Sequence, residues 1–67
     1  MAAVPTAVEL CDACWEGRVG AATLCLDRGV DVDGVDEEGL APLFIAIQMS
    51  NLELVRLLLS RGATVTG

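Results

Sequence analysis

The chain has 67 residues, enough for one small domain; 54% of them are hydrophobic, yet ten acids and four arginines leave a net charge of −6. With neither Lys nor His, a surface for nucleic acid is not expected. The longest apolar run, residues 40 to 47, is far below the roughly 18 residues of a membrane span, and residues 1 to 8 lack the basic start of a signal peptide, so we expect a cytoplasmic or nuclear protein.

Two short helices are predicted after a lead-in at residues 1–6. Thr6 followed by Glu9 is a capping-box spacing, in which the two side chains would bond free backbone N–H groups, so a helix should begin near Ala7. Gly17 would break this helix. A second helix is expected from Val19 to Arg28, and it should stop at Gly29.

Residues 30 to 41 are predicted to form an extended turn or hairpin, because strand-forming valines alternate with Asp and Gly. Five of the ten acids lie at residues 31 to 38. An EF-hand calcium loop is the alternative, but with Gly34 at the invariant glycine its first and twelfth positions are Gly29 and Leu40, which have no carboxylate. A solvated turn is the better interpretation.

The remaining segment repeats the two-helix pattern. Pro42 suits a first helical position, a break is expected near Ser50 and Asn51, and a leucine-rich helix should run from Leu52 to Arg61 before Gly62. A shift of 33 residues gives eight identities: Leu10 with Leu43, Ala13 with Ala46, Leu24 with Leu57, Leu26 with Leu59, Arg28 with Arg61, Gly29 with Gly62, Val32 with Val65 and Gly34 with Gly67. Two copies of one unit are therefore present.

Together these residues resemble the ankyrin repeats. The similarity is strongest at residues 36–46, at 52–59 and at the Gly62-Ala63 pair, and weaker in the first unit. The tetrapeptide usually read as Thr-Pro-Leu-His is Ala41-Pro42-Leu43-Phe44 here, and Ser50-Asn51 replaces the usual Gly-His. The resemblance implies an all-α repeat fold, a helix-turn-helix solenoid with a hairpin-like turn, made of repeat 1 at residues 7–35 and repeat 2 at residues 36–67.

The outer side of the first unit is predicted to be solvated. Glu9, Asp12 and Glu16 stand at the positions that Pro42, Ile45 and Met49 occupy in the second unit. The first unit thus has the character of an N-terminal cap, while the second ends with its leucine-rich helix uncovered. We expect this chain to be the N-terminal part of an array with further ankyrin repeats after Gly67.

Cys11 and Cys14 form a C-x-x-C spacing, but they align with Phe44 and Ile47, and Cys25 lies in the segment aligned with the leucine run. They are interpreted as small core residues. A disulfide is unfavourable because Cβ atoms three residues apart on a helix are about 5–6 Å apart. Zinc would need four Cys or His ligands, so a redox thiol or a metal site is the weaker alternative.

No catalytic constellation appears without His or Lys, so no enzyme and no cofactor are expected. The resemblance implies a protein-protein interaction module or scaffold, and a purely structural cap without a partner of its own is the alternative. By analogy with the concave groove of ankyrin proteins, the candidate binding residues are Trp15, Glu16, Val35, Glu37, Glu38, Leu40, Gln48 and Met49. Their chemistry suits a protein partner with a basic and apolar patch.

Overall fold

The computed structural model describes residues 6–64 and contains four helices. They are α1 (Ala7–Glu16), α2 (Val19–Asp27), α3 (Pro42–Gln48) and α4 (Leu52–Ser60). None of the residues between 6 and 64 forms a β-strand, so the all-α prediction is confirmed. The lead-in before Thr6 and the predicted end of repeat 2 after Thr64 lie outside the described residues.

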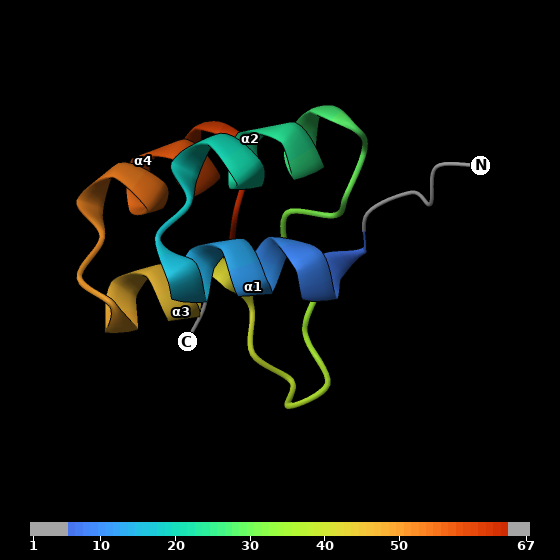
Figure 1. The fold of residues 1–67 in the computed structure, drawn as a ribbon, viewed down its shortest axis with the longest axis horizontal. Helices are drawn as coiled ribbons and strands as arrows, with labels where there is room; N and C mark the ends of the chain where they lie inside the picture. Colours follow the sequence, from blue (N-terminus) through green and yellow to red (C-terminus); the bar gives the residue numbers. More distant parts are fainter. Residues whose placement is uncertain (1–5, 65–67) are drawn as a thin grey trace.

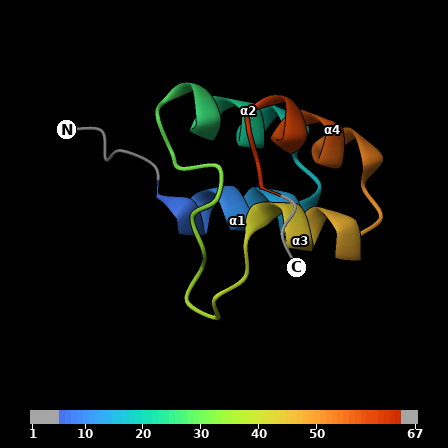
Figure 2. The same ribbon diagram turned by 180° about the vertical axis from the view of Figure 1, so that it is seen from behind.

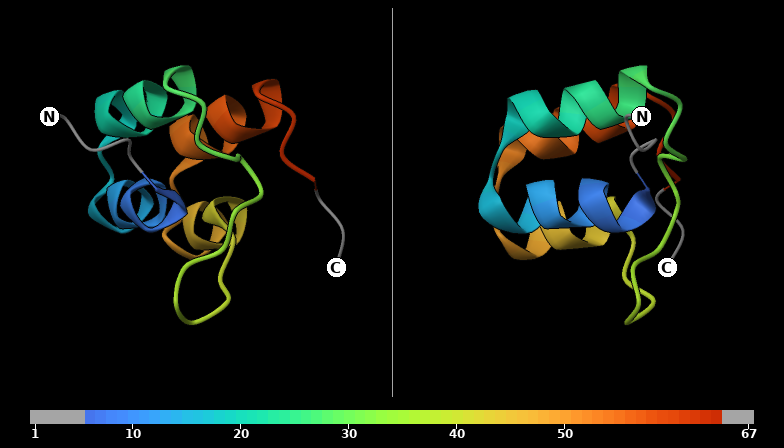
Figure 3. Two further views of the ribbon diagram at one scale, coloured as in Figure 1. Left: turned by 90° about the vertical axis from the view of Figure 1, so that its right-hand side faces the viewer. Right: turned by 45° about the vertical axis from the view of Figure 1, so that its right-hand side comes forward.

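The helices are arranged in two layers. α1 and α3 lie side by side in one layer, and α2 and α4 lie side by side in the other (Figures 1 and 3). Each helix pair forms an antiparallel hairpin, and the segment between α2 and α3 projects beyond the α1–α3 layer as a hairpin-like turn (Figure 2). The predicted solenoid arrangement is therefore present, with one hairpin per repeat.

The backbone repeats in the same 33-residue register as the sequence. The bounds of α2 and α4 differ by 33 at both ends. Gly17 and Ser50, which separate the helices of each pair, both have a positive φ, of 72° and 55°. Ser50 therefore makes the left-handed turn that glycine makes in the first repeat, although a side chain disfavours it.

Three local expectations need correction. α2 ends at Asp27 and α4 at Ser60, because Arg28 and Arg61 are the C-terminal cap residues rather than the last helical ones. Thr6 is the N-cap of α1, but its side chain makes no capping hydrogen bond. The prediction that the Thr6 side chain bonds a free backbone N–H group of α1 is therefore wrong.

The core lies between the two layers and between the two repeats. Leu10, Ile45, Leu54 and Leu58 are the largest fully buried aliphatic side chains. Polar contacts also join the two repeats near the C-terminal ends of α2 and α4. The Asp27 carboxylate, at the end of α2, lies 2.8 Å from the guanidinium of Arg61, which follows α4. The Asp33 carboxylate accepts hydrogen bonds from the Thr64 backbone N–H and hydroxyl, each at 2.9 Å.

A close approach fixes the turn against α1. A Cβ atom at Gly34 would lie 2.7 Å from the Cβ of Ala7 and 3.1 Å from the backbone oxygen of Asp31. Only glycine leaves room for this crossing. The turn is thereby held next to the first turn of α1, and from there the chain continues to the tip of the turn.

Candidate functional site

The tip of the turn is built around Asp36. Its Oδ1 accepts hydrogen bonds from the backbone N–H groups of Glu38 and Leu40, both at 2.9 Å. The backbone N–H of Asp36 donates to the oxygen of Leu40 at 3.1 Å, and Gly39 takes a φ of 81° between them. An Asp side chain that bonds the backbone in this way stabilises a tight turn. The tip therefore presents Glu37 and Glu38 in a defined loop.

A hollow of about 240 Å³ lies between this tip and α1. We call it the tip groove; its lining residues are Val8, Asp12, Trp15, Asp36, Glu37 and Glu38. Trp15 is 41% exposed, which is unusual for so large an apolar side chain. Four carboxyl groups and no basic group line the hollow, so it combines an aromatic surface with a negative potential.

This chemistry suits a cation carried on an apolar stem. The face of an indole ring attracts Arg and Lys side chains, and the surrounding carboxylates add charge attraction that salt screens only partly at short range. Val8 adds an aliphatic contact at the opposite end of the same helical face. The tip groove can therefore hold the side chains of a basic, partly apolar protein segment.

Three of the eight predicted binding residues, Trp15, Glu37 and Glu38, come together in the tip groove. Glu16 instead lines a different hollow. Leu40 is half-buried, and its backbone closes the turn while its oxygen accepts a contact from the Cys11 thiol at 3.5 Å. The others, Val35, Gln48 and Met49, are exposed but do not line the tip groove.

Val8, Asp12 and Asp36 were not among the predicted binding residues. Val8, Asp12 and Trp15 stand at i, i+4 and i+7, the spacing that places side chains on one helical face, and this pattern could have found the first two. Asp36 gave no comparable signal, because its position depends on how the turn folds back towards α1.

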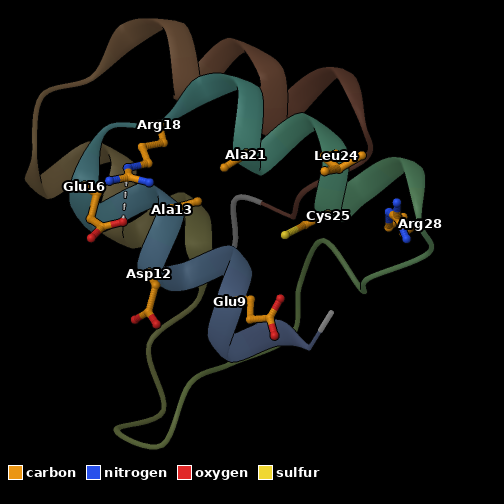
Figure 4. A pocket seen from close by; sticks show the side chains of 9 residues that line it. All are labelled: Glu9, Asp12, Ala13, Glu16, Arg18, Ala21, Leu24, Cys25 and Arg28. Atoms are coloured by element: carbon orange, nitrogen blue, oxygen red, sulfur yellow. Dashed lines mark ion pairs between the residues drawn. The ribbon is translucent and has the colours of Figure 1, made fainter. Parts of the chain in front are cut away.

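The second hollow, of about 380 Å³, lies on the outer side of the α1–α2 hairpin. Figure 4 shows the residues of this end groove: Glu9, Asp12, Ala13, Glu16, Arg18, Ala21, Leu24, Cys25 and Arg28. Glu16 and Arg18 form an exposed ion pair at 3.4 Å, which contributes little stability. Glu9, Asp12 and Glu16 are all exposed, as expected for a solvated outer side of the first repeat.

The three cysteines are buried, as predicted, and all are free thiols. Burial raises the pKa of Cys11 to about 11, and the charges of Asp36 and Asp12 act in the same direction. Burial likewise raises the pKa of Cys14 to about 11. These groups stay protonated near neutral pH, whereas the thiolate is the form that reacts and binds metals. Within residues 6–64 no group of three or more His, Cys, Asp or Glu is placed to hold a metal ion.

The fold and the 33-residue register are those of ankyrin repeats, and the model of this family, described as ankyrin repeats in many copies, matches residues 10–59. The chain belongs to the ankyrin-repeat family. Ankyrin repeats are generally protein-interaction modules rather than enzymes. Over the part of the chain that the structure covers, no helix has the length and apolar character needed to cross a bilayer.

Several curated proteins are similar to this ankyrin-repeat chain. Ankyrin repeat domain-containing protein oryK of Aspergillus oryzae is 38% identical over 56 residues, which are 84% of this chain and 9% of that protein. Ankyrin repeat, SAM and basic leucine zipper domain-containing protein 1 of Nomascus leucogenys is 42% identical over 50 residues, 75% of this chain and 10% of that protein. The B-cell lymphoma 3 protein homolog of Mus musculus is 46% identical over 46 residues, 67% of this chain and 10% of its own length. This chain thus spans about a tenth of these relatives.

Proposed function

We propose that this ankyrin-repeat chain is a protein-interaction module whose tip groove binds a basic, partly apolar segment of a partner protein. The observation that carries the proposal is the grouping of Trp15 with the carboxylates of Asp12, Asp36, Glu37 and Glu38 around one hollow. Exposed aromatic side chains with a charged rim are typical of binding hot spots. The charge of the rim favours association with cationic segments by long-range attraction.

The structure also favours binding over a purely structural role for this region. A structural cap needs only a polar surface, and the exposed carboxylates Glu9 and Glu16 already provide one on the outer side of α1. Trp15 lies instead beside the tip of the turn, where a smaller polar residue would serve a cap equally well. A large exposed indole at this place is better explained by contact with a partner.

We further propose that this module is part of a longer array. Support comes from its length, about a tenth of its relatives, and from the apolar side of the second repeat, on which a further repeat following Gly67 would pack. A cytoplasmic or nuclear location and a scaffold role belong to the same proposal, since three reduced thiols suit a reducing compartment.

The proposal is tested with synthetic peptides that combine Arg or Lys with Leu or Val, and with matched peptides carrying Glu in place of the basic residues. Trp15→Ala should weaken binding of the basic peptides about 30-fold, because it removes the aromatic anchor. Glu37→Arg should weaken it about tenfold, chiefly through slower association at low salt.

Glu53→Arg is the matched control, since Glu53 is an exposed acid on α4 that does not line the tip groove. It makes the same change in net charge as Glu37→Arg and should leave affinity within about twofold at physiological salt. Isothermal titration calorimetry measures the affinity of all three variants for the peptides. Equal losses for Glu37→Arg and Glu53→Arg would mean that overall charge, rather than the tip groove, binds the peptides.

A further inference from the structure

The tip groove has the size of a site for one side chain. Its volume of about 240 Å³ is below the roughly 300 to 1,000 Å³ of pockets that enclose whole small-molecule ligands. Residues of α1 line it on one side, and residues at the tip of the turn line it on the other. The groove therefore fits a single long side chain of a partner, held between these two walls.

Contacts on both sides of the tip fix the distance between the walls. The Cys11 thiol on α1 donates to the oxygen of Leu40 at 3.5 Å, just after the tip, and Gly34 crosses closely over α1 just before it. The charges of Asp36 and Asp12 both raise the pKa of the Cys11 thiol, so both carboxylates lie near this point of α1. The tip groove is thus formed before a partner binds, which lowers the cost of ordering it.

Asp36 has one carboxylate oxygen available for a ligand. Its Oδ1 accepts the backbone N–H groups of Glu38 and Leu40, both at 2.9 Å, whereas no donor among residues 6–64 bonds its Oδ2. The two hydrogen bonds hold the carboxyl group in place, so the direction of Oδ2 is fixed. Asp12 and Trp15 are three residues apart on α1, the spacing that makes side chains neighbours on a helix surface.

The acids of the tip groove have no positive partner within the described part of the chain. Residues 6–64 form two ion pairs, one in the end groove and one between the C-terminal ends of α2 and α4. Neither pair includes an acid that lines the tip groove. An incoming cation would therefore not have to displace an arginine of the chain itself.

Arginine and lysine side chains would use this site differently. The guanidinium of arginine is planar, so its face can stack on an indole ring while its N–H groups point outward, in the same plane, towards carboxylate oxygens. The ammonium of lysine is a compact and strongly hydrated charge, which the same acids attract mainly as a point charge. An exposed indole beside a carboxylate of fixed direction therefore favours arginine.

We propose that the tip groove selects arginine over lysine, with the guanidinium stacked on Trp15 and donating hydrogen bonds to Oδ2 of Asp36 and to the carboxylate of Asp12. This preference rests on the proposed function, since it concerns the partner of the same groove. The aliphatic stem of the arginine contacts Val8, which lines the groove on the same face of α1. The remaining acids of the rim attract either cation and do not distinguish them.

Two peptides that are identical except for arginine or lysine at the basic positions test the preference. Isothermal titration calorimetry at physiological salt should show the arginine peptide binding about tenfold more tightly, the effect of roughly one additional charge-assisted hydrogen bond. Equal affinities would overturn the preference and leave the proposed function intact. If neither peptide binds, the proposed function fails and the preference fails with it.

Asp36→Asn tests the assigned oxygen. The amide oxygen of Asn can still accept the two backbone N–H groups of the turn, but an NH₂ group replaces Oδ2 and cannot accept a bond from a guanidinium. The arginine peptide should lose about tenfold in affinity and the lysine peptide no more than about threefold, so the preference should nearly disappear. An unchanged preference would overturn the role of Asp36.

Asp31→Asn is the matched control for this variant. Asp31 is an exposed acid of the same turn whose Oδ1 accepts the backbone N–H of Asp33 at 2.9 Å, and it does not line the tip groove. It removes the same charge and should keep the tenfold preference for arginine. If circular dichroism shows that Asp36→Asn loses its helices, Asp12→Asn replaces it, because Asp12 is exposed on α1. Equal loss of the preference in Asp31→Asn would overturn the proposal, since charge alone would then explain it.

Discussion

Cys11 and Cys14 are small residues at positions where the second repeat has Phe44 and Ile47. Both thiols are fully buried in the core cluster that also contains residues of α3, whereas Phe44 and Ile47 are about half exposed. Small side chains here let α1 and α3 approach closely, and larger ones would overpack the interface. Repeat packing is therefore sufficient to account for the C-x-x-C spacing.

The raised thiol pKa values predict a loss of stability at alkaline pH. The unfolded thiols have a pKa near 9.0, while Cys11 and Cys14 have pKa values of about 11 in the fold. Below pH 9 both states are protonated and the stability is complete; as pH rises through about 9 to 11 the unfolded state loses protons first, so the fold loses stability. The upper limit of this loss in the free energy of unfolding is roughly 2 to 3 kcal/mol per thiol.

The composition leaves few other groups that could cause such a loss of stability at alkaline pH. The chain has no Tyr, His or Lys, so its cysteines are the only side chains expected to titrate between about pH 8 and 11. Urea unfolding under reducing conditions, repeated across this range, should show the midpoint falling for the unmodified chain. The double variant Cys11→Ala, Cys14→Ala should show a much flatter dependence. Parallel losses in the two proteins would rule out Cys11 and Cys14 as the cause and leave Cys25, whose pKa burial also raises.

At the scale of the helices, the four N-termini are stabilised in different ways. The N-cap residues are Thr6, Arg18, Ala41 and Asn51, and only the Asn51 side chain makes a capping hydrogen bond, with its Oδ1 3.2 Å from the Leu54 nitrogen. α3 begins with Pro42 at its first position, which has no N–H to satisfy. α4 thus has a local start signal that α1 and α2 lack.

Asn51→Ala should destabilise the chain by about 1 kcal/mol, because an N–H of α4 loses its partner. For a domain of this size, such a loss lowers the melting temperature by roughly 4 to 8 °C. Thr6→Ala is the comparison: Thr6 is also an N-cap, but its side chain makes no capping bond, so its loss should change the melting temperature little. Thermal melts followed by circular dichroism measure both. A larger loss for Thr6→Ala than for Asn51→Ala would contradict this assignment of the caps.

The sequence predicted the helices better than their caps. Gly17 and Gly29 were predicted to end the first two helices, and both have a positive φ in the fold. Ser50 and Asn51 were interpreted only as a break, yet Ser50 adopts the left-handed conformation and Asn51 caps α4. The Thr6 to Glu9 spacing predicted a capping bond that the Thr6 side chain does not make. A cap depends on side-chain rotamers as well as residue type, which explains the difference.

For the whole molecule, the 33-residue repeat was sufficient to predict two stacked helix pairs, because equivalent residues must occupy equivalent places. The grouping of residues in the tip groove was only partly predictable. Trp15, Glu37 and Glu38 meet because Gly34 lets the turn cross close to α1 and Asp36 folds its tip. Glu16 points instead to the end groove, since one further residue along α1 rotates the side chain by about 100°.

The most direct test of binding at the tip groove uses Trp15 itself. It is the only Trp in a chain without Tyr, so its emission reports this site alone. When the basic peptides saturate the chain, the emission of Trp15 should shift to the blue and should be protected from an added aqueous quencher, because the peptide covers an indole that is 41% exposed in the free protein. The comparison is made at the peptide concentration that half-saturates the control variant Glu53→Arg. At this concentration Glu37→Arg should show almost no change in emission or quenching, because it binds the peptide about tenfold more weakly. Saturable binding, measured by calorimetry, that leaves the emission and quenching of Trp15 unchanged would contradict binding at the tip groove.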